Sequence, residues 1–315
     1  MREGAMKKVC YVGLRDFRVG DTLAMEASVD LIESLIGEHI KILYEKENEN
    51  VGNSWMRDRN VPVDLVVHAG GNEWAGFDDL EECCIADNVP VIYLGVGTGS
   101  RSFNGTTKKM FRACKVLMLG RDHIATESAQ RLGGEVYKLT CPSLFYYRSV
   151  DSGDRLGIVF QSNRCREKAH CIRSEKIYKQ SLGFIQDRLK ENPMLICHYI
   201  DDYLDLYNRF PESSKDLRYS TRIEDYIKWY SQCGVIYSTR LHGVMLAASL
   251  GKPTVGLKAG VKKMCAFDHL PINVVEPAKV SCKDLSNPEQ VNAIKQSMAK
   301  EFNDKLSVFL NKNLL

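Results

Sequence analysis

The sequence has no long apolar run and almost no net charge. Its longest apolar stretches, such as residues 89–96, fall far short of the ~20 consecutive apolar residues that a membrane helix needs. The 43 basic and 40 acidic residues leave a net charge of +3, which gives no reason to expect nucleic-acid binding. Residues 1–8 lead into the apolar run 9–12 without the apolar region of a signal peptide. We therefore expect no membrane span, no nucleic-acid partner and no secretory leader.

The sequence also has no Cys-x-x-Cys pair, although it contains 11 cysteines. Cys165 and Cys171, with His170 nearby, are a candidate metal cluster, but no second pair of ligands accompanies them. Other cysteines lie inside apolar runs, namely Cys10, Cys114, Cys197 and Cys233. We favour buried free thiols in a reducing cytoplasm, and we expect a cytoplasmic protein without a metal site.

Short apolar runs alternate with helical patterns along most of the 315 residues. The runs that resemble strands are 8–14, 40–44, 63–68, 90–94, 115–119, 136–139, 156–160, 194–199, 234–238 and 254–257. Continuously apolar strands separated by helices indicate parallel sheets covered on both faces. A polar, turn-rich stretch at 147–155 interrupts the pattern, which then restarts.

The restart predicts an α/β protein with two doubly wound domains, residues 1–148 and 149–315, which face each other across a cleft. This division agrees with the usual domain size of ~150 residues. Asn287 and Pro288 are typical of a helix start, so we expect a final helix from there to about Phe309.

Glycines and polar residues gather where the predicted strands end, and ligands of open α/β sheets bind at that edge. These positions hold Gly20, Asp21, Gly70, Gly71, Gly97, Gly99 and Arg121 in the first half, and Arg164, His198, Ser238, Arg240, His242 and Lys258 in the second. The spacing Gly95-x-Gly97-x-Gly99 differs from the dinucleotide fingerprint Gly-x-Gly-x-x-Gly, so we expect no nicotinamide cofactor. The alternative to a ligand at these glycines is a set of tight turns.

The stretch Ser238–Gly243 is the most informative part of the sequence. A predicted strand ends and a helix begins within it, so Arg240 and His242 lie near a helix N-terminus, which favours an anion. Cations there oppose the helix dipole, so anion recognition explains them better than helix stability does. The alternative is an exposed arginine with a capping or core histidine.

Five stretches, taken in order, resemble the polysaccharide pyruvyl transferase family. They are Gly20–Leu23, Asp64–Gly71, Pro90–Gly99, Gly120–His123 and Ser238–Gly243, the last continuing through Leu250–Val255. The Ser-x-Arg-Leu-His-Gly block is the most specific, and the resemblance covers roughly residues 10–260. The sequence departs from the family at Arg18-Val19, where an Asn usually precedes Gly-Asp.

The resemblance implies two Rossmann-like domains arranged as in GT-B glycosyltransferases, with the final helix crossing back to the first domain. It implies phosphoenolpyruvate as donor and a sugar of a capsule or exopolysaccharide precursor as acceptor, either lipid-linked or nucleotide-linked, with no cofactor. Such an enzyme works in the cytoplasm near the membrane surface without spanning it. The resemblance also implies that Arg240 and His242 are active-site residues.

The chemistry of ketal formation suggests roles for individual residues. The enol carbon must be protonated, and His242 is the candidate acid. Asp21 is a candidate base or acceptor-binding residue, or alternatively a helix cap. The donor carboxylate and phosphate need fixed cations and polar groups, and our candidates are Arg240, Arg164, Arg121, Lys258 and Ser238.

The acceptor is expected at the loops of the first domain. The candidates there are Gly20, Gly70, Gly71, Gly97 and Gly99. Acceptor specificity is expected chiefly from loops 45–60 and 98–107, which contain Trp55 and Phe103. Trp55 and Trp74 are candidates to stack on a sugar face, the alternative being packed or exposed loop aromatics. Two other functions stay open at this point. One is a GT-B glycosyltransferase with a nucleotide-sugar donor, and the other is a catalytically inactive sugar- or phosphate-binding protein.

Overall fold

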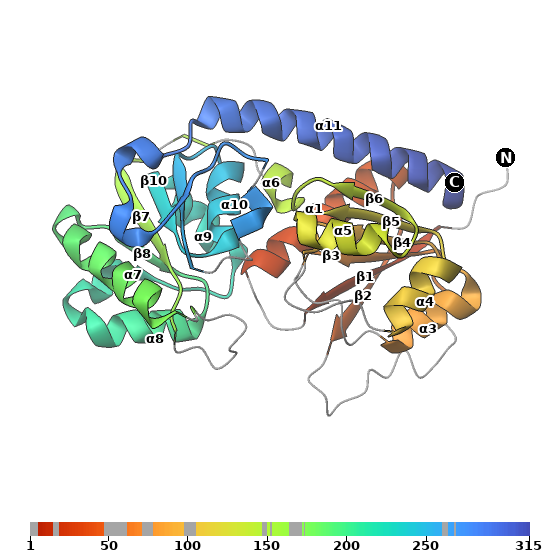
Figure 1. Ribbon diagram of the computed structural model, residues 1–315, viewed down its shortest axis with the longest axis horizontal. Helices are drawn as coiled ribbons and strands as arrows, with labels where there is room; N and C mark the ends of the chain where they lie inside the picture. Colours follow the sequence, from red (N-terminus) through yellow and green to blue (C-terminus); the bar gives the residue numbers. More distant parts are fainter. Residues whose placement is uncertain are drawn as a thin grey trace. The chain divides into compact units, whose positions relative to one another are not determined.

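The chain folds into two α/β units in a computed structural model (Figure 1). The described residues are 6–14, 19–46, 62–70, 78–97, 105–146, 150–151, 153–163, 172, 174–259, 264–267 and 269–315. One unit consists of Met1–Phe17, Asp21–Pro142 and Ser297–Leu315, and the other of Arg18–Gly20 and Ser143–Gln296. The main segment of the second unit begins at Ser143, a few positions before the predicted division between residues 148 and 149. That division lies in the predicted linker 147–155, of which 147–149 and 152 lie outside the described residues.

The first unit is built on a parallel sheet in the order β2-β1-β3-β4-β5-β6. Its strands are β1 (Lys8–Leu14), β2 (Ile40–Lys46), β3 (Leu65–Ala69), β4 (Val91–Leu94), β5 (Val116–Gly120) and β6 (Glu135–Lys138). Every residue of β3, β4 and β5 is buried, which explains why these strands are apolar apart from His68 of β3. The helices are α1 (Val19–Ile36), α3 (Asp78–Asp87), α4 (Gly105–Ala113) and α5 (His123–Gln130).

The second unit has a parallel sheet in the order β12-β11-β10-β7-β8-β9. Its strands are β7 (Arg155–Phe160), β8 (Met194–Cys197), β9 (Leu217–Arg218), β10 (Cys233–Ser238), β11 (Thr254–Leu257) and β12 (Val274–Val275). Its helices are α6 (Ser143–Tyr146), α7 (Glu175–Arg188), α8 (Ile200–Arg209), α9 (Ile223–Ser231) and α10 (Leu241–Ser249). Short 3₁₀ turns complete it at Leu189–Glu191, Pro211–Asp216, Met264–Phe267, Pro277–Lys279 and Cys282–Asp284.

The last helix, α11 (Pro288–Asn313), contributes residues to both units. Its start matches the predicted cap, because the Asn287 side chain accepts the N–H of Glu289 at 2.9 Å. Within the second unit, Lys295 Nζ donates to the carbonyl of Ser249 on α10 at 2.6 Å. Within the first unit, Lys305 Nζ lies 4.1 Å from the ring centroid of Tyr137 on β6.

The α/β prediction is confirmed by these two six-stranded parallel sheets. None of the helices in the described part of the chain has the length and apolar character that crossing a bilayer requires.

Candidate functional site

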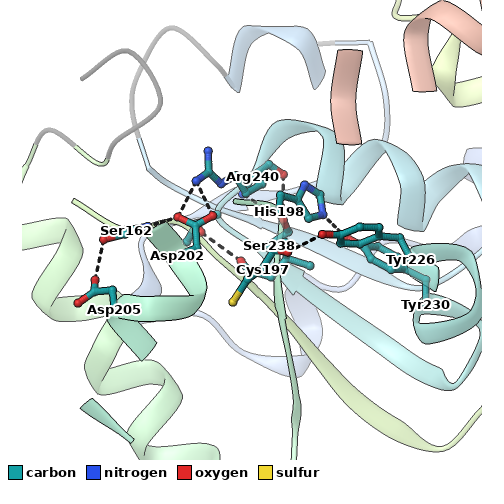
Figure 2. Close-up of polar contacts among 11 residues, drawn as sticks. Ser162, Cys197, His198, Asp202, Asp205, Tyr226, Tyr230, Ser238 and Arg240 are labelled. Carbon is teal, nitrogen blue, oxygen red and sulfur yellow. Dashed lines mark hydrogen bonds and ion pairs between the residues drawn. The ribbon is translucent and has the colours of Figure 1, made fainter. Parts of the chain in front are cut away.

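The candidate site lies where the direction of chain progression changes in the second sheet. From β7 the chain moves outward to β8 and β9 on one side, and β10, β11 and β12 lie on the other. The carboxyl ends of β7 and β10 are therefore neighbours at a topological switch point, where open α/β sheets bind ligands. The residues that follow these two strands, and those after β8, form the site (Figure 2).

Ser238 and Gly243 shape the turn from β10 into α10. The buried Ser238 hydroxyl donates to the carbonyl of Arg240 at 2.8 Å and accepts the Arg240 N–H at 3.0 Å. A Cβ on Gly243 would lie only 2.2 Å from the Ser238 Oγ and 3.0 Å from Val159 of β7. The Ser-x-Arg-Leu-His-Gly block thus specifies a tight turn, and the Ser238 hydroxyl, which we predicted to bind the donor, is engaged in holding that turn.

Arg240 is paired with an acidic residue that the sequence analysis did not single out. Its Nη2 donates to both carboxylate oxygens of Asp202, at 2.6 and 2.5 Å, and the two side chains are 7% and 0% exposed (Figure 2). Arg240 Cζ also lies 4.3 Å from the ring centroid of Tyr199. Arg240 occupies the N-cap position of α10, but its side chain makes no capping hydrogen bond. Its guanidinium is oriented instead by the contacts with Asp202 and Tyr199.

Asp202 is itself fixed by the loop after β7. Its Oδ1 accepts the backbone N–H of Ser162 at 2.8 Å. Burial raises the pKa of Asp202, and the Arg240 guanidinium and the Ser162 N–H partly oppose that rise. Its place in the first turn of α8 adds the favourable end of a helix dipole to a buried carboxylate.

A second buried carboxylate on α8, Asp205, braces the same loop. It accepts the Ser162 hydroxyl at 2.6 Å, the Tyr178 hydroxyl at 2.7 Å and the Arg209 Nε at 2.9 Å. Thus α8 turns two acidic side chains toward the interior of the unit, and both hold Ser162 (Figure 2).

His198, directly after β8, is a buried neutral imidazole. Its Nε2 lies 3.1 Å from the Tyr230 hydroxyl, and its ring meets Tyr226 edge-on at 5.3 Å between centroids. Burial, together with the nearby charges of Arg240 and His242, holds the pKa of His198 well below its ordinary value. His198 therefore does not add a positive charge to the site at neutral pH.

His242 is the second residue of α10 and is partly buried. It lies against the backbone of Gly20, which belongs to the same unit: a Cβ on Gly20 would lie 1.7 Å from the His242 Nδ1. Only glycine fits beside this imidazole. Lys258 follows β11, is partly buried, and donates its backbone N–H to Val275 of β12 at 2.8 Å.

The other predicted residues that are described lie in the first unit. Asp21 is in the first turn of α1. Gly70 has a φ of +69°, and a Cβ there would meet the Ala24 Cβ at 2.5 Å. A Cβ on Gly97 would lie 2.5 Å from the Nε of Arg121, which is 2% exposed, so these two predicted residues pack against each other.

Several predicted residues lie outside the described residues. These are Arg164 of the donor set, Gly71 and Gly99 of the acceptor loops, the aromatic residues Trp55, Trp74 and Phe103, Arg18 of the unusual first motif, and the cluster Cys165, His170 and Cys171. Within the described ranges, no group of three or more His, Cys, Asp or Glu side chains could hold a metal ion.

Comparison with known families decides the membership of this chain. A family model described as polysaccharide pyruvyl transferase matches residues 19–258, which include the turn that carries Arg240 and His242. The chain belongs to the polysaccharide pyruvyl transferase family. A search of curated proteins finds no significant match.

Solved structures resemble this pyruvyl transferase family member in fold. The S. aureus MnaA–UDP complex is 13% identical with a TM-score of 0.53, covering 96% of this chain and 91% of that one. A putative UDP-N-acetylglucosamine 2-epimerase from Listeria monocytogenes is 12% identical, with a TM-score of 0.53 and coverage of 96% and 91%. The Streptomyces nogalater glycosyltransferase SnogD is 12% identical, with a TM-score of 0.52 and coverage of 96% and 99%. These likenesses confirm the predicted GT-B type of fold.

Proposed function

We propose that this protein transfers a pyruvyl group from phosphoenolpyruvate to two hydroxyls of a sugar in a surface polysaccharide precursor, forming a cyclic ketal. The observation that carries the proposal is the turn from β10 into α10. It places Arg240 and His242 at a helix N-terminus, on the switch point of a sheet, in a chain of the pyruvyl transferase family.

The proposed donor site relies on orientation more than on net charge. Asp202 compensates the charge of Arg240, so the pair is close to neutral, and its value for binding is the fixed plane of the guanidinium. A planar fork matches the carboxylate or phosphate of the donor, and the N-terminal N–H groups of α10 add a favourable dipole. Lys258 after β11 is, with Arg240, a described cation of the proposed donor set in the second unit, and Arg121 of the same set lies in the first unit.

The proposed acid is His242. Protonation of the donor methylene carbon uses the electrons of its C=C bond and leaves an oxocarbenium-like centre at the neighbouring carbon. One sugar hydroxyl adds to that centre with loss of its proton, and the second hydroxyl then displaces inorganic phosphate. The base that takes the hydroxyl protons is assigned to Asp21 on the sequence alone.

A nucleotide-sugar donor is the second candidate, because the fold is shared with a UDP complex and with a glycosyltransferase. In that case the turn before α10 would bind a diphosphate. The acceptor in either reaction is a lipid-linked or nucleotide-linked saccharide.

A phosphate-release assay distinguishes these functions. The protein is incubated with phosphoenolpyruvate and a panel of lipid-linked and nucleotide-linked sugars, and parallel reactions contain UDP- or CMP-sugars without phosphoenolpyruvate. Acceptor-dependent phosphate release from phosphoenolpyruvate supports the proposal, as does a saturable rise of Tm with this ligand. Nucleotide release without phosphoenolpyruvate supports a glycosyltransferase, and ligand binding without turnover supports an inactive binding protein.

A further inference from the structure

We infer that Asp202 is a positioning residue of the donor site, which sets the orientation in which Arg240 meets the anionic group of the donor. The inference rests on the proposed function for the identity of the donor, but the geometry that carries it concerns any anion bound at Arg240.

Two contacts hold the guanidinium of Arg240. One nitrogen of Arg240 donates to both oxygens of Asp202, at 2.6 and 2.5 Å, and the ring of Tyr199 lies 4.3 Å from Cζ. The carboxylate fixes the position of Nη2, and the aromatic contact limits the movement of the rest of the group about that nitrogen. Together they hold the whole fork in one orientation, and a planar recognition site depends on that orientation.

Stability alone does not explain the pair of Arg240 and Asp202. A buried ion pair contributes little net stability compared with apolar residues of similar size, because both charges lose their hydration. An arginine at the start of a helix also opposes the dipole of that helix. The pair therefore maintains a cation at a place where folding does not require one, at the switch point of the sheet.

Asp202 is held in place by contacts other than the one with Arg240. Its backbone belongs to the first turn of α8, and its Oδ1 is held by the Ser162 N–H at 2.8 Å. The carboxylate, which is 0% exposed, is thus connected to the loop after β7 and cannot follow Arg240 if the guanidinium moves. Asp202 is therefore the fixed group of the pair, and Arg240 is the group that it orients.

The two possible roles of Asp202, positioning of Arg240 and simple charge compensation, predict opposite effects of its removal on donor affinity. If Asp202 only reduced the charge of Arg240, its removal would leave a stronger cation and tighter anion binding. If Asp202 positions Arg240, its removal weakens anion binding in spite of the gain in net positive charge. Asp202→Asn keeps the shape and removes the charge, whereas Asp202→Glu keeps the charge and changes the geometry.

The experiment measures the Kd of phosphoenolpyruvate, inorganic phosphate and UDP by titration calorimetry on the wild-type chain and on both variants. Circular dichroism and Tm are recorded alongside to establish the folded fraction. The matched control is Asp216→Asn, which breaks another Arg–Asp pair of the same unit, since Asp216 Oδ1 accepts from Arg155 Nη2 at 2.8 Å. We expect both Asp202 variants to raise the Kd about tenfold or more, as a displaced hydrogen-bonding fork does, and the control to leave the Kd unchanged.

The outcomes separate this inference from the proposed function. A wild-type chain that binds UDP but not phosphoenolpyruvate contradicts the proposed donor, and the ratio of Kd values for UDP then tests Asp202. Unchanged or tighter binding in Asp202→Asn overturns the positioning role, as does normal binding in Asp202→Glu. Binding of none of the three ligands by the wild-type chain also overturns it. If Asp202→Asn fails to fold, Asp202→Glu alone decides. Where turnover is measurable, the KM of the donor rises in the variants and the KM of the acceptor does not.

Discussion

At the scale of single residues, Arg240 combines an ion pair, in which Nη2 contacts both oxygens of Asp202, with an aromatic contact at Cζ. Lysine keeps the charge but cannot present a planar fork to Asp202 and the donor together. We expect Arg240→Lys to weaken donor binding and to lower kcat/KM by roughly 10²-fold. The measurement is donor Kd and steady-state kinetics, and near-normal values would show that Arg240 does not bind the donor.

His242 is expected to act mainly in the transition state. We expect His242→Gln to lower kcat by roughly 10²–10⁴-fold and to change donor Kd little, because protonation of carbon comes after binding. Three measurements on one variant separate the possible roles. Lost donor affinity with normal saturated turnover would indicate anion binding, a lowered Tm with proportional loss of activity would indicate a structural role, and a kcat within about threefold of wild type would exclude His242 as the acid.

Gly20 provides a steric test of the same imidazole. A Cβ at this position would lie 1.7 Å from the His242 Nδ1, so Gly20→Ala must displace the ring. We expect kcat to fall about tenfold or more, with donor Kd nearly unchanged. The matched control is Gly183→Ala in α7, where a Cβ meets nothing within 4 Å. That variant should gain up to about 1 kcal/mol of stability and keep full activity; normal kcat in Gly20→Ala would show that the ring position is not critical.

At the scale of elements, the central strands could be predicted because they are buried throughout and almost entirely apolar, as in β3, β4 and β5. The helix α8 was missed for the opposite reason. It exposes Ile200, Leu204 and Tyr207, and two of its three buried residues are the acidic Asp202 and Asp205, with Leu206 as the third, which departs from the pattern that periodicity analysis assumes. Because α8 was not predicted, the partner of Arg240 could not be found from the sequence.

The contact between α11 and α10 has a pH dependence that can be measured. Burial lowers the pKa of Lys295 to about 8 in the folded chain, whereas the pKa of this lysine in the unfolded chain is ~10.4. Between these two pH values the unfolded chain binds more protons, so the contribution of Lys295 to the free energy of unfolding rises with pH. Below pH 8 both states are protonated and the cost of burying the charge is fully present.

We therefore expect the stability of the wild-type chain relative to Lys295→Met to increase between about pH 8 and 10.4. Urea unfolding of both proteins across this range is the measurement, and the difference between them removes the effect of all other titrating groups. A difference that stays constant, or that falls as the pH rises, would contradict the burial of this amine.

At the scale of the whole molecule, the alternation of strands and helices was sufficient to predict two doubly wound α/β units. The GT-B type and the family followed from the resemblance of five stretches, of which the Ser-x-Arg-Leu-His-Gly block is the most specific. The strand order could not be read from the sequence, because a list of apolar runs does not state which strands pair. The pairing of β7 with β10 brings Ser162 and Arg240 to one site, although the two residues are far apart along the chain. The predicted cleft, the acceptor loops and the role of Asp21 stay predictions.

The division of α11 between the units has a consequence for the order of folding during synthesis. The first unit begins with β1 but includes Ser297–Leu315, while the second unit is formed almost entirely by the intervening Ser143–Gln296. A ribosome therefore releases nearly the whole second unit before the first has received its last segment. Contacts of high sequence separation, such as the 3.8 Å ion pair of Lys312 with Glu135, close last. The nascent first unit stays incomplete until Ser297–Leu315 have been synthesised. During that time it is a substrate for chaperones that bind exposed apolar surface.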